Sequence, residues 1–352
     1  MTILVTGAAG FIGSNFVLDW FDCSKEDVIS LDLLTYAGNL ENLSSLSHNS
    51  HHHFVKGSIR DRDLVLSLLK KYQIRAIVNL AGESHVDRSI QESKDFIETN
   101  ILGAYDLLES ARAYWNHLDQ RLKQDFRFLH ISSDEVYGSL NSSDQPSDEK
   151  DPYKPNSPYS ASKAASNHLV RAWFQTYKLP IFIVNSSNNY GLYQYPEKLI
   201  PLCILNALKG NPLPIYGDGL QIRDWLYVQD HCSALREILK RGQIGETYNI
   251  GGWNEKTNLE VVGTLCTILD ELKPRLDGKS YSDQITFVKD RPGHDRRYAI
   301  DASKLEREFN WKPKESFETG LCKTVLWYLK HEGRMNDLMC GQYHHWIQKQ
   351  YS

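Results

Sequence analysis

The chain has 352 residues, of which 41% are hydrophobic and 24% charged, and its formal net charge is -4. This length allows one large or two ordinary domains with an ample core. The weak negative charge argues against a basic surface of the kind that attracts nucleic acid or an anionic membrane.

The cysteines and the first residues indicate the cellular compartment of the protein. The first ten residues, "MTILVTGAAG", lack a basic start and reach a glycine-rich turn after a few apolar residues, so we expect neither a signal peptide nor a membrane anchor. The cysteines are scattered without a C-x-x-C pair, which argues against a disulfide framework and a zinc site, so we expect a cytoplasmic protein without a bound metal. The six positions are Cys23, Cys203, Cys232, Cys266, Cys322 and Cys340.

Short apolar runs alternate with longer segments of helical period over the first half of the chain. We expect strands at 2–6, 27–32, 52–57, 76–82, 126–132 and 180–187, and helices at 61–72, 94–115 and 159–177. This alternation predicts an α/β fold with a doubly wound parallel sheet of the Rossmann type.

After residue 190, Pro- and Gly-rich turns separate helical stretches near 230–241, 257–273 and 316–330. We therefore assign residues 1–190 to a dinucleotide-binding domain, to which later segments should return. Residues 191–352 are assigned mainly to a second, smaller α/β domain.

The segment "VTGAAGFIGSNF" places three glycines between the first strand and a helix. Gly7 permits a tight turn, Gly10 lets the backbone approach a pyrophosphate, and Gly13 allows close packing of helix and strand. The second strand ends at Asp32, where a carboxylate can accept both hydroxyls of a ribose. The pattern predicts NAD rather than NADP as cofactor, because an NADP site would favour an arginine there.

A second group of polar residues has the chemistry of proton transfer. Tyr159 and Lys163 stand at i and i+4 on one face of a helix, where the ammonium and a positive nicotinamide would lower the pKa of the phenol. Ser133 ends a strand and can bond the same oxygen. Asp134 and Glu135 follow it directly, and adjacent acids at a strand exit are either solvated turn residues or groups placed for proton transfer.

The chain resembles the extended short-chain dehydrogenase/reductase superfamily and, within it, the family of dTDP-glucose 4,6-dehydratases. The resemblance covers about residues 2–330 and rests on segments such as "TGAAGFIGS", "ESHVDRSI", "SSDEVYG", "SPYSASKA", "SNNYG", "YPEKLIPL", "QIRDWLYV" and "DRPGHDRRYAID". It implies a lyase of 6-deoxysugar biosynthesis that uses NAD and a nucleotide-diphosphate sugar. It also implies a homodimer, in which the helices at 94–115 and 159–177 could pair across a two-fold axis.

The resemblance also implies a role for each polar residue. Tyr159 would take the C4 hydroxyl proton while hydride leaves C4 for NAD, with Lys163 holding the ribose and Ser133 the C4 oxygen. The C4 ketone then makes the C5 proton acidic enough for Glu135 to remove it. Asp134 would protonate the C6 hydroxyl as it leaves as water, and the hydride would return to C6. Because one acid removes a proton and the other donates one, the two acids need different pKa values.

Further contacts are implied in the same way. Beside the glycines, Asp32, Tyr159 and Lys163, the cofactor contacts are Phe11, Ile12, Leu33, Leu34, Thr35, Ser58, Ile59, Leu80, Ala81, Gly82, Ser84, Thr99 and Asn189. The implied partner of the diphosphate is an arginine, whose planar fork suits that group. The substrate contacts are Ser84, His85, Ser133, Asn188, Glu197, Lys198, Leu199, Pro214, Tyr216, Arg223, Asn258, Arg291, His294 and Tyr298, with Arg223 as that arginine.

Three other functions remain open from the sequence. The chain departs from the family pattern at Leu33, Ser58, Gly82, Ser133 and Leu192, which leaves room for another nucleotide sugar such as UDP-glucose. A nucleotide-sugar 4-epimerase would share the fold, NAD and the Ser-Tyr-Lys trio, but it needs no acid pair. A non-catalytic NAD sensor would have no reason to keep the tyrosine and lysine at this spacing.

Overall fold

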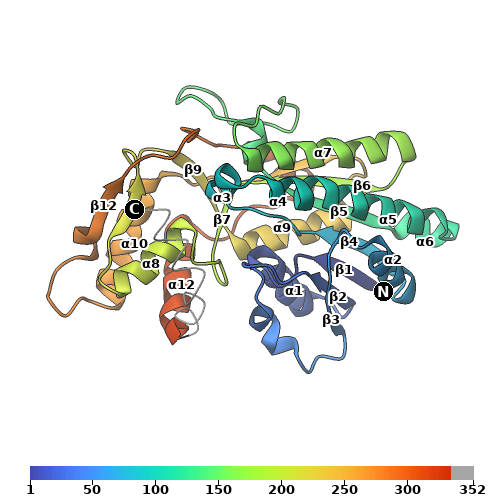
Figure 1. Cartoon of the computed structure of the whole chain (residues 1–352), viewed down its shortest axis with the longest axis horizontal. Helices are drawn as coiled ribbons and strands as arrows, with labels where there is room; N and C mark the ends of the chain where they lie inside the picture. Colours follow the sequence, from blue (N-terminus) through green and yellow to red (C-terminus); the bar gives the residue numbers. More distant parts are fainter. Residues whose placement is uncertain (334–352) are drawn as a thin grey trace.

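A seven-stranded parallel sheet forms the centre of the computed structural model, which describes residues 1–333 (Figure 1). Its strand order is β3-β2-β1-β4-β5-β6-β10, which confirms the predicted doubly wound fold. The strands are β1 (Thr2–Thr6), β2 (Asp27–Asp32), β3 (His52–Lys56), β4 (Ile74–Asn79), β5 (Arg127–Ser133), β6 (Ile181–Ser186) and β10 (Thr247–Ile250).

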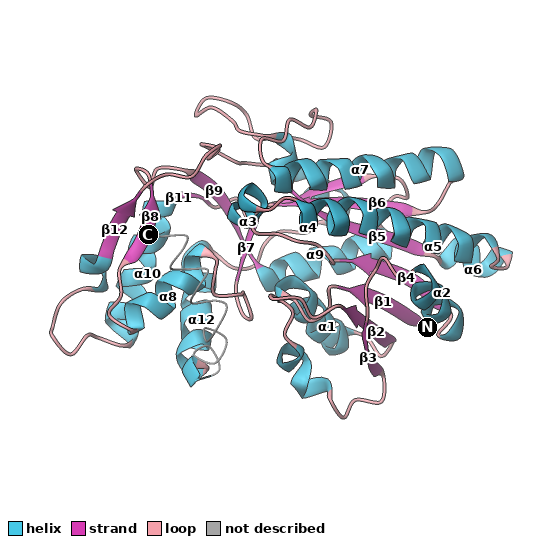
Figure 2. Ribbon diagram, viewed as in Figure 1, coloured by secondary structure: helices cyan, strands magenta, loops and turns pink. Residues whose placement is uncertain are grey.

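Helices cover both faces of this sheet, as Figure 2 shows. One core joins the sheet to α1 (Phe11–Cys23), α9 (Val228–Arg241) and α11 (Ser303–Phe309). A second core joins the opposite face to α2 (Arg62–Lys71), α5 (Ala104–Asn116) and α7 (Pro158–Tyr177). Every residue of β1 is buried, because a parallel sheet covered on both faces has no solvent side.

The segment 94–115 was predicted as one helix, and the structure corrects this. It consists of α4 (Lys94–Phe96), a π-helical stretch η2 (Ile97–Gly103) and α5. Asn100 in the wider π turn points inward, where its amide bonds the backbone of Glu83 and the hydroxyl of Ser162. These distant contacts account for the irregularity, which the local pattern does not contain.

Helix α7 follows its sequence signals closely. Ser157 caps its N-terminus in a reciprocal box with Ser160, Pro158 takes the first helical position, and Lys178 ends the helix in the left-handed conformation. This firm start places Tyr159 and Lys163 within the first two turns, above the ends of the central strands.

The second part of the molecule has its own core. Helices α8 (Leu199–Leu208), α10 (Asn258–Leu272) and α12 (Phe317–Lys330) pack together beside two small sheets. These sheets are β11-β9-β7 and β12-β8. Their strands are β7 (Asn188–Tyr190), β8 (Leu213–Tyr216), β9 (Ile222–Tyr227), β11 (Glu255–Thr257) and β12 (Ile285–Val288).

Short helical elements complete the described chain. They are η1 (Leu40–Leu46), α3 (Val86–Gln91), α6 (Gln120–Asp125), η3 (Asp134–Tyr137) and η4 (Tyr281–Gln284). Because β10 pairs with β6 and α9 packs on α1, we propose a division near residue 190 with these later segments returning to the first part. Residues 334–352 of the assigned second domain, with Cys340, lie outside the described residues.

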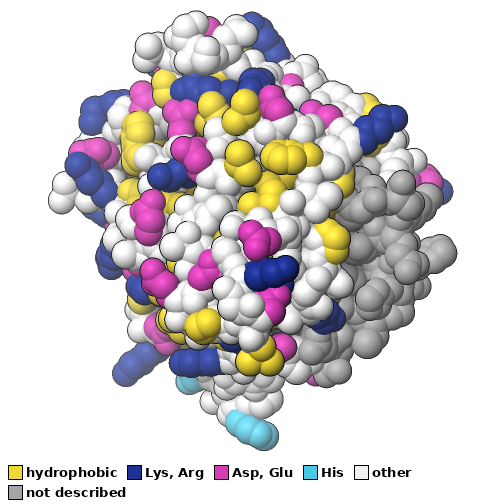
Figure 3. Space-filling view, turned by 90° about the vertical axis from the view of Figure 1, so that its left-hand side faces the viewer, with side chains coloured by type: hydrophobic (Ala, Val, Ile, Leu, Met, Phe, Trp, Pro, Cys, Tyr) yellow, Lys and Arg dark blue, Asp and Glu magenta, His cyan; other side chains and the backbone are white. Residues whose placement is uncertain are grey.

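Two observations concern the distribution of charged and apolar side chains, one on a face of the surface and one along the helices. At the end formed by the second part, acidic and basic side chains are interspersed with apolar ones (Figure 3). Among residues 1–333, no helix is long and apolar enough to cross a membrane.

Candidate active site

The turn from β1 into α1 has the shape that a pyrophosphate requires. Gly7 has φ +65°, and a Cβ there would lie 2.7 Å from the backbone of Leu80 and Ala81. A Cβ at Gly13 would lie 2.0 Å from the carbonyl oxygen of Gly7. Helix α1 begins after Gly10, and no side chain of the described residues caps it, so its first amides can bind an anion.

The carboxylate of Asp32 is held at the end of β2 by backbone donors. Oδ2 accepts from the N–H of Ala9 at 2.9 Å and Oδ1 from that of Leu34 at 2.7 Å. Both oxygens keep a further lone pair for ribose hydroxyls. Leu34, predicted to contact the cofactor, does not line the cavity, because its backbone turns at φ +57° to orient Asp32 instead.

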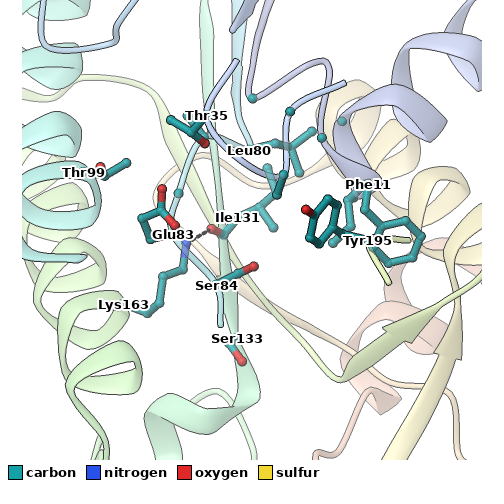
Figure 4. Close-up of a pocket in the computed structure, with 18 of the residues that line it drawn as sticks. Phe11, Thr35, Leu80, Glu83, Ser84, Thr99, Ile131, Ser133, Lys163 and Tyr195 are labelled. Carbon is teal, nitrogen blue, oxygen red and sulfur yellow. Dashed lines mark hydrogen bonds between the residues drawn. The ribbon is translucent and has the colours of Figure 1, made fainter. Parts of the chain in front are cut away.

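All other predicted cofactor residues line one cavity, part of which is drawn in Figure 4. Several residues that were not predicted also line this cavity. Gly38 in "TYAGN" is one, since a Cβ there would lie 2.9 Å from the Asp32 carboxylate. Others include Gly57, Arg60, Glu83, Ile131, Ser132, Ser187 and Tyr195. The signal in the sequence that could have indicated these residues is that they stand close to predicted ones.

Tyr159 and Lys163 both reach this cavity from α7. The Nζ of Lys163 donates to the carbonyl of Ile131 at 2.7 Å, and burial lowers the pKa of the ammonium to about 8. The predicted lowering of the Tyr159 pKa is wrong for the protein without a bound nicotinamide. Burial raises this pKa, the carboxylates of Glu135 and Asp134 raise it further, and the Ser133 hydroxyl acts in the opposite direction.

The acid pair lies on η3, directly after β5. Ser133 caps this turn, since its Oγ accepts from the N–H of Glu135 at 3.3 Å, and it donates to Oδ1 of Asp134 at 3.2 Å. The residues Asp134 and Glu135 are only 2% and 9% exposed, which excludes solvated turn residues. Within residues 1–333, Oδ2 of Asp134 and Oε2 of Glu135 have no hydrogen-bond partner, so both can serve a ligand.

The two acids differ in their electrostatic surroundings. Burial raises the pKa of Asp134 well above its ordinary value, and the charges of Glu135 and Asp224 raise it further. Burial also raises the pKa of Glu135, but Arg291, Arg223 and Lys198 oppose this change. Asp134 is therefore disposed to hold a proton and Glu135 to lose one.

A second cavity adjoins the first and collects the predicted substrate residues. All of them line it except Ser133, which lines the cofactor cavity, and Tyr298. Tyr298 instead places its ring under the guanidinium of Arg223, 4.3 Å from the centroid, and donates its hydroxyl to Asp295. It orients the arginine rather than the substrate.

Basic groups in this second cavity are fixed by acceptors. Arg223 donates to the carbonyls of Ile222 at 2.8 Å and Asp295 at 3.0 Å. Arg291 donates to Asp87 at 3.1 Å, and Asp87 also accepts from Tyr216 at 3.2 Å. Asp87 was missed, although it lies in the "ESHVDRSI" segment that supports the resemblance.

The two cavities form one cleft, because they share seven lining residues. These are Ser84, Glu135, Asn188, Asn189, Gln194, Glu197 and Lys198. A dinucleotide in the first cavity and a sugar nucleotide in the second would therefore meet at Glu135.

A polar latch of three residues ties the loop after β2 to the second part of the molecule. Tyr36 donates to Oε1 of Glu197 at 2.9 Å, and Nε of Arg88 donates to Oε2 at 3.0 Å. The guanidinium of Arg88 also lies 3.9 Å from the centroid of the Tyr36 ring. Because Glu197 lines both cavities, the latch lies at the place where they join.

Comparison with known proteins agrees with this geometry. The model of the GDP-mannose 4,6 dehydratase family matches residues 4–324. The chain is 54% identical to the dTDP-glucose 4,6-dehydratase of Salmonella typhimurium, over 100% of this chain and 99% of that protein.

Two solved structures are similar over 96% of the chain. One is the dTDP-glucose 4,6-dehydratase from Bacillus anthracis in complex with NAD, with a TM-score of 0.85, 46% identity and 99% of that chain covered. The other is the dTDP-glucose 4,6-dehydratase DesIV from Streptomyces venezuelae with NAD and TYD bound, with a TM-score of 0.87, 43% identity and 100% covered. The chain therefore belongs to the dTDP-glucose 4,6-dehydratase family of the nucleotide-sugar dehydratases.

Proposed function

We propose that the protein is an NAD-dependent hydro-lyase that converts dTDP-glucose into dTDP-4-keto-6-deoxyglucose. The observation that carries this proposal is the buried acid pair at the junction of the two cavities, beside Tyr159 and Lys163. The glycine turn and Asp32 fit NAD, and the relatives that bind NAD support its use here. When bound, NAD supplies the acceptor of hydride from C4 and later the donor of hydride to C6.

The side chains of this cleft then move the protons. Tyr159 takes the proton of the C4 hydroxyl, with Ser133 holding the same oxygen and Lys163 supplying a positive charge nearby. Once C4 is a ketone, the C5 proton is α to a carbonyl and Glu135 removes it. Asp134 protonates the C6 oxygen, the C6–O bond breaks, and a C5–C6 double bond forms as water leaves. Glu135 returns a proton to C5 once C6 has received its hydride, which completes the 4-keto-6-deoxy sugar.

The experiment is incubation of the purified protein with dTDP-glucose or UDP-glucose, followed by mass spectrometry and NMR of the product. We expect loss of one water from dTDP-glucose, at a higher rate than from UDP-glucose, with deuterium at C5 when the solvent is heavy water. Inversion at C4 without a change of mass would instead identify an epimerase and contradict the proposal.

The double variant Asp134→Asn with Glu135→Gln tests the acid pair within this reaction. It keeps the shape of both side chains but removes their proton transfer, so C4 oxidation should continue while water loss falls by on the order of 10³-fold. The measurement is single-turnover analysis of the bound sugar, which should be a 4-keto hexose. Water loss near the parent rate in this variant would contradict the roles of both acids.

We further propose that the protein acts as a cytoplasmic homodimer. The support is a set of exposed apolar side chains on η2, α5 and α7, namely Ile97, Leu102, Tyr105 and Tyr177, which are 38–47% exposed. Helices α5 and α7 lie side by side, so they can present this set to a second copy. Sedimentation velocity should give twice the chain mass, and Tyr105→Arg should shift the protein toward the monomer.

A further inference from the structure

We propose that Tyr137 is a positioning residue that holds Asp134 and Glu135 in register with the helix that carries Tyr159 and Lys163. The inference rests on the proposed roles of the two acids and goes beyond them, because Tyr137 lines neither cavity. It is the last residue of η3, the single turn on which both acids stand.

The hydroxyl of Tyr137 is hydrogen-bonded to two asparagines. It donates to Oδ1 of Asn249 at 2.8 Å and accepts from Nδ2 of Asn185 at 2.8 Å. Asn185 on β6 and Asn249 on β10 are direct partners in the parallel pairing of these strands. Both asparagines are 0% exposed and Tyr137 is 6% exposed, so water does not compete for these bonds.

The same network reaches the helix that carries the tyrosine and lysine. Nδ2 of Asn167 donates to Oδ1 of Asn185 at 2.9 Å, and Asn167 lies on α7, one turn after Lys163. Asn185 thus bonds η3 through Tyr137 and α7 through Asn167. The buried side chain of Asn185 therefore links the turn that carries the two acids to the helix that carries Tyr159.

The turn η3 depends on this anchor because it is short. It has four residues, and it is followed by Gly138 at φ +85° and an irregular excursion over 139–156, the green loop at the top of Figure 1. A turn of this length has few hydrogen bonds of its own. Apart from a backbone bond from the N–H of Lys154 to the carbonyl of Val136, contacts of its side chains set the place of its carboxylates. Displacement of a reacting group by about 1 Å can lower a rate by about 10²-fold.

Tyr153 offers a matched control within the same network. Its hydroxyl accepts from Nδ2 of Asn167 at 3.2 Å and from Nδ2 of Asn185 at 3.4 Å, and its ring contacts that of Tyr137. It belongs to the excursion rather than to η3. Tyr153→Phe therefore removes a phenol from the same network without releasing the turn that carries the acids.

The test compares Tyr137→Phe, Tyr153→Phe and the parent protein, using dTDP-glucose with hydrogen or deuterium at C5. For Tyr137→Phe we expect kcat for water loss to fall about 10- to 100-fold, with KM and the single-turnover rate of C4 oxidation close to the parent values. Its C5 isotope effect should rise, because proton removal by Glu135 becomes the slowest step. Tyr153→Phe should keep the parent kcat and isotope effect.

Two results would overturn the inference. One is a parent-like kcat and isotope effect for Tyr137→Phe, and the other is an equal loss in Tyr153→Phe, which would show a general structural role. If Tyr137→Phe does not fold, Asn249→Leu removes the acceptor of the same hydroxyl, and parent-like water loss there also overturns the inference. Failure of the parent protein to lose water would overturn the proposed function itself, so the two failures are distinguishable.

Discussion

The cofactor cavity is built largely from turns at the ends of neighbouring strands, whereas the substrate cavity is assembled from segments far apart in the chain. In the first, Gly7 and Gly13 meet within one turn, and Asp32 is held by the backbone of Ala9. In the second, Arg291 finds its partner 204 residues earlier in Asp87. The cofactor half thus depends on backbone shape and the substrate half on charged pairs that bring distant segments together.

This difference predicts how each half responds to substitution. Changes in charged pairs should weaken substrate binding without altering the chemistry, since those pairs orient cations that hold the substrate. Changes where the halves meet should act on the reaction itself.

The largest effect of a single substitution is expected beside that meeting point, from Tyr159→Phe. The variant lacks the group that accepts the C4 hydroxyl proton but loses little contact area, so kcat should fall about 10²-fold or more. The affinity for the nucleotide sugar, measured by titration calorimetry, should stay close to that of the parent. A Phe variant with activity near that of the parent would contradict the role of Tyr159 as the proton acceptor.

Asp87→Asn tests a charged pair in the substrate half. The amide keeps the shape but loses the charge that fixes Arg291, so KM for dTDP-glucose should rise about 10-fold with kcat nearly constant. The control is Asp218→Asn, which removes an ion pair with Arg296 whose two side chains are 54% and 51% exposed. Because exposed ion pairs contribute little free energy, Asp218→Asn should leave KM close to the parent value. An equal rise of KM in both variants would contradict the role of Asp87.

Tyr36→Phe tests the latch that spans both halves. The ring can still lie against Arg88, but the hydrogen bond to Glu197 is lost, so NAD should dissociate several-fold faster, up to about 10-fold. The measurement is the rate at which the bound cofactor leaves during rapid gel filtration. The control is Tyr281→Phe, which loses a hydrogen bond to the carbonyl of Lys273 and lines neither cavity. An unchanged release rate in Tyr36→Phe would refute the latch.

The smallest effect is expected in the cofactor half, from Glu83→Gln. Burial raises the pKa of Glu83 from 4.5 to about 7, helped by the charges of Asp95 and Glu197. The folded chain therefore binds this proton more tightly than the unfolded chain. The stability from this group is complete below pH 4.5 and is lost as the pH rises through about 7.

Removal of the carboxyl group should therefore flatten the fall in the free energy of unfolding across this pH range. Urea unfolding of the parent and of Glu83→Gln at several pH values measures the two slopes. Identical slopes would contradict the raised pKa.

Local patterns in the sequence determined the first half of the fold and the cofactor turn. The strands at 2–6 and 27–32 were predicted with the bounds that β1 and β2 have. The glycines, Asp32, and the spacing of Tyr159 and Lys163 could also be interpreted directly. The spacing of the glycines and that of Tyr159 and Lys163 are features of the local sequence. The place of Asp32 beside the glycine turn also depends on the pairing of β1 with β2.

Only the tertiary structure decided the features that depend on distant partners. The short strands after residue 190 were not predicted, because each has three to six residues and is defined by its pairing. The π turn around Asn100 depends on contacts with Glu83 and Ser162, and Arg291 depends on Asp87. The raised pKa of Tyr159 has the same origin, since burial and the acids on η3 outweigh what the nearby sequence suggests.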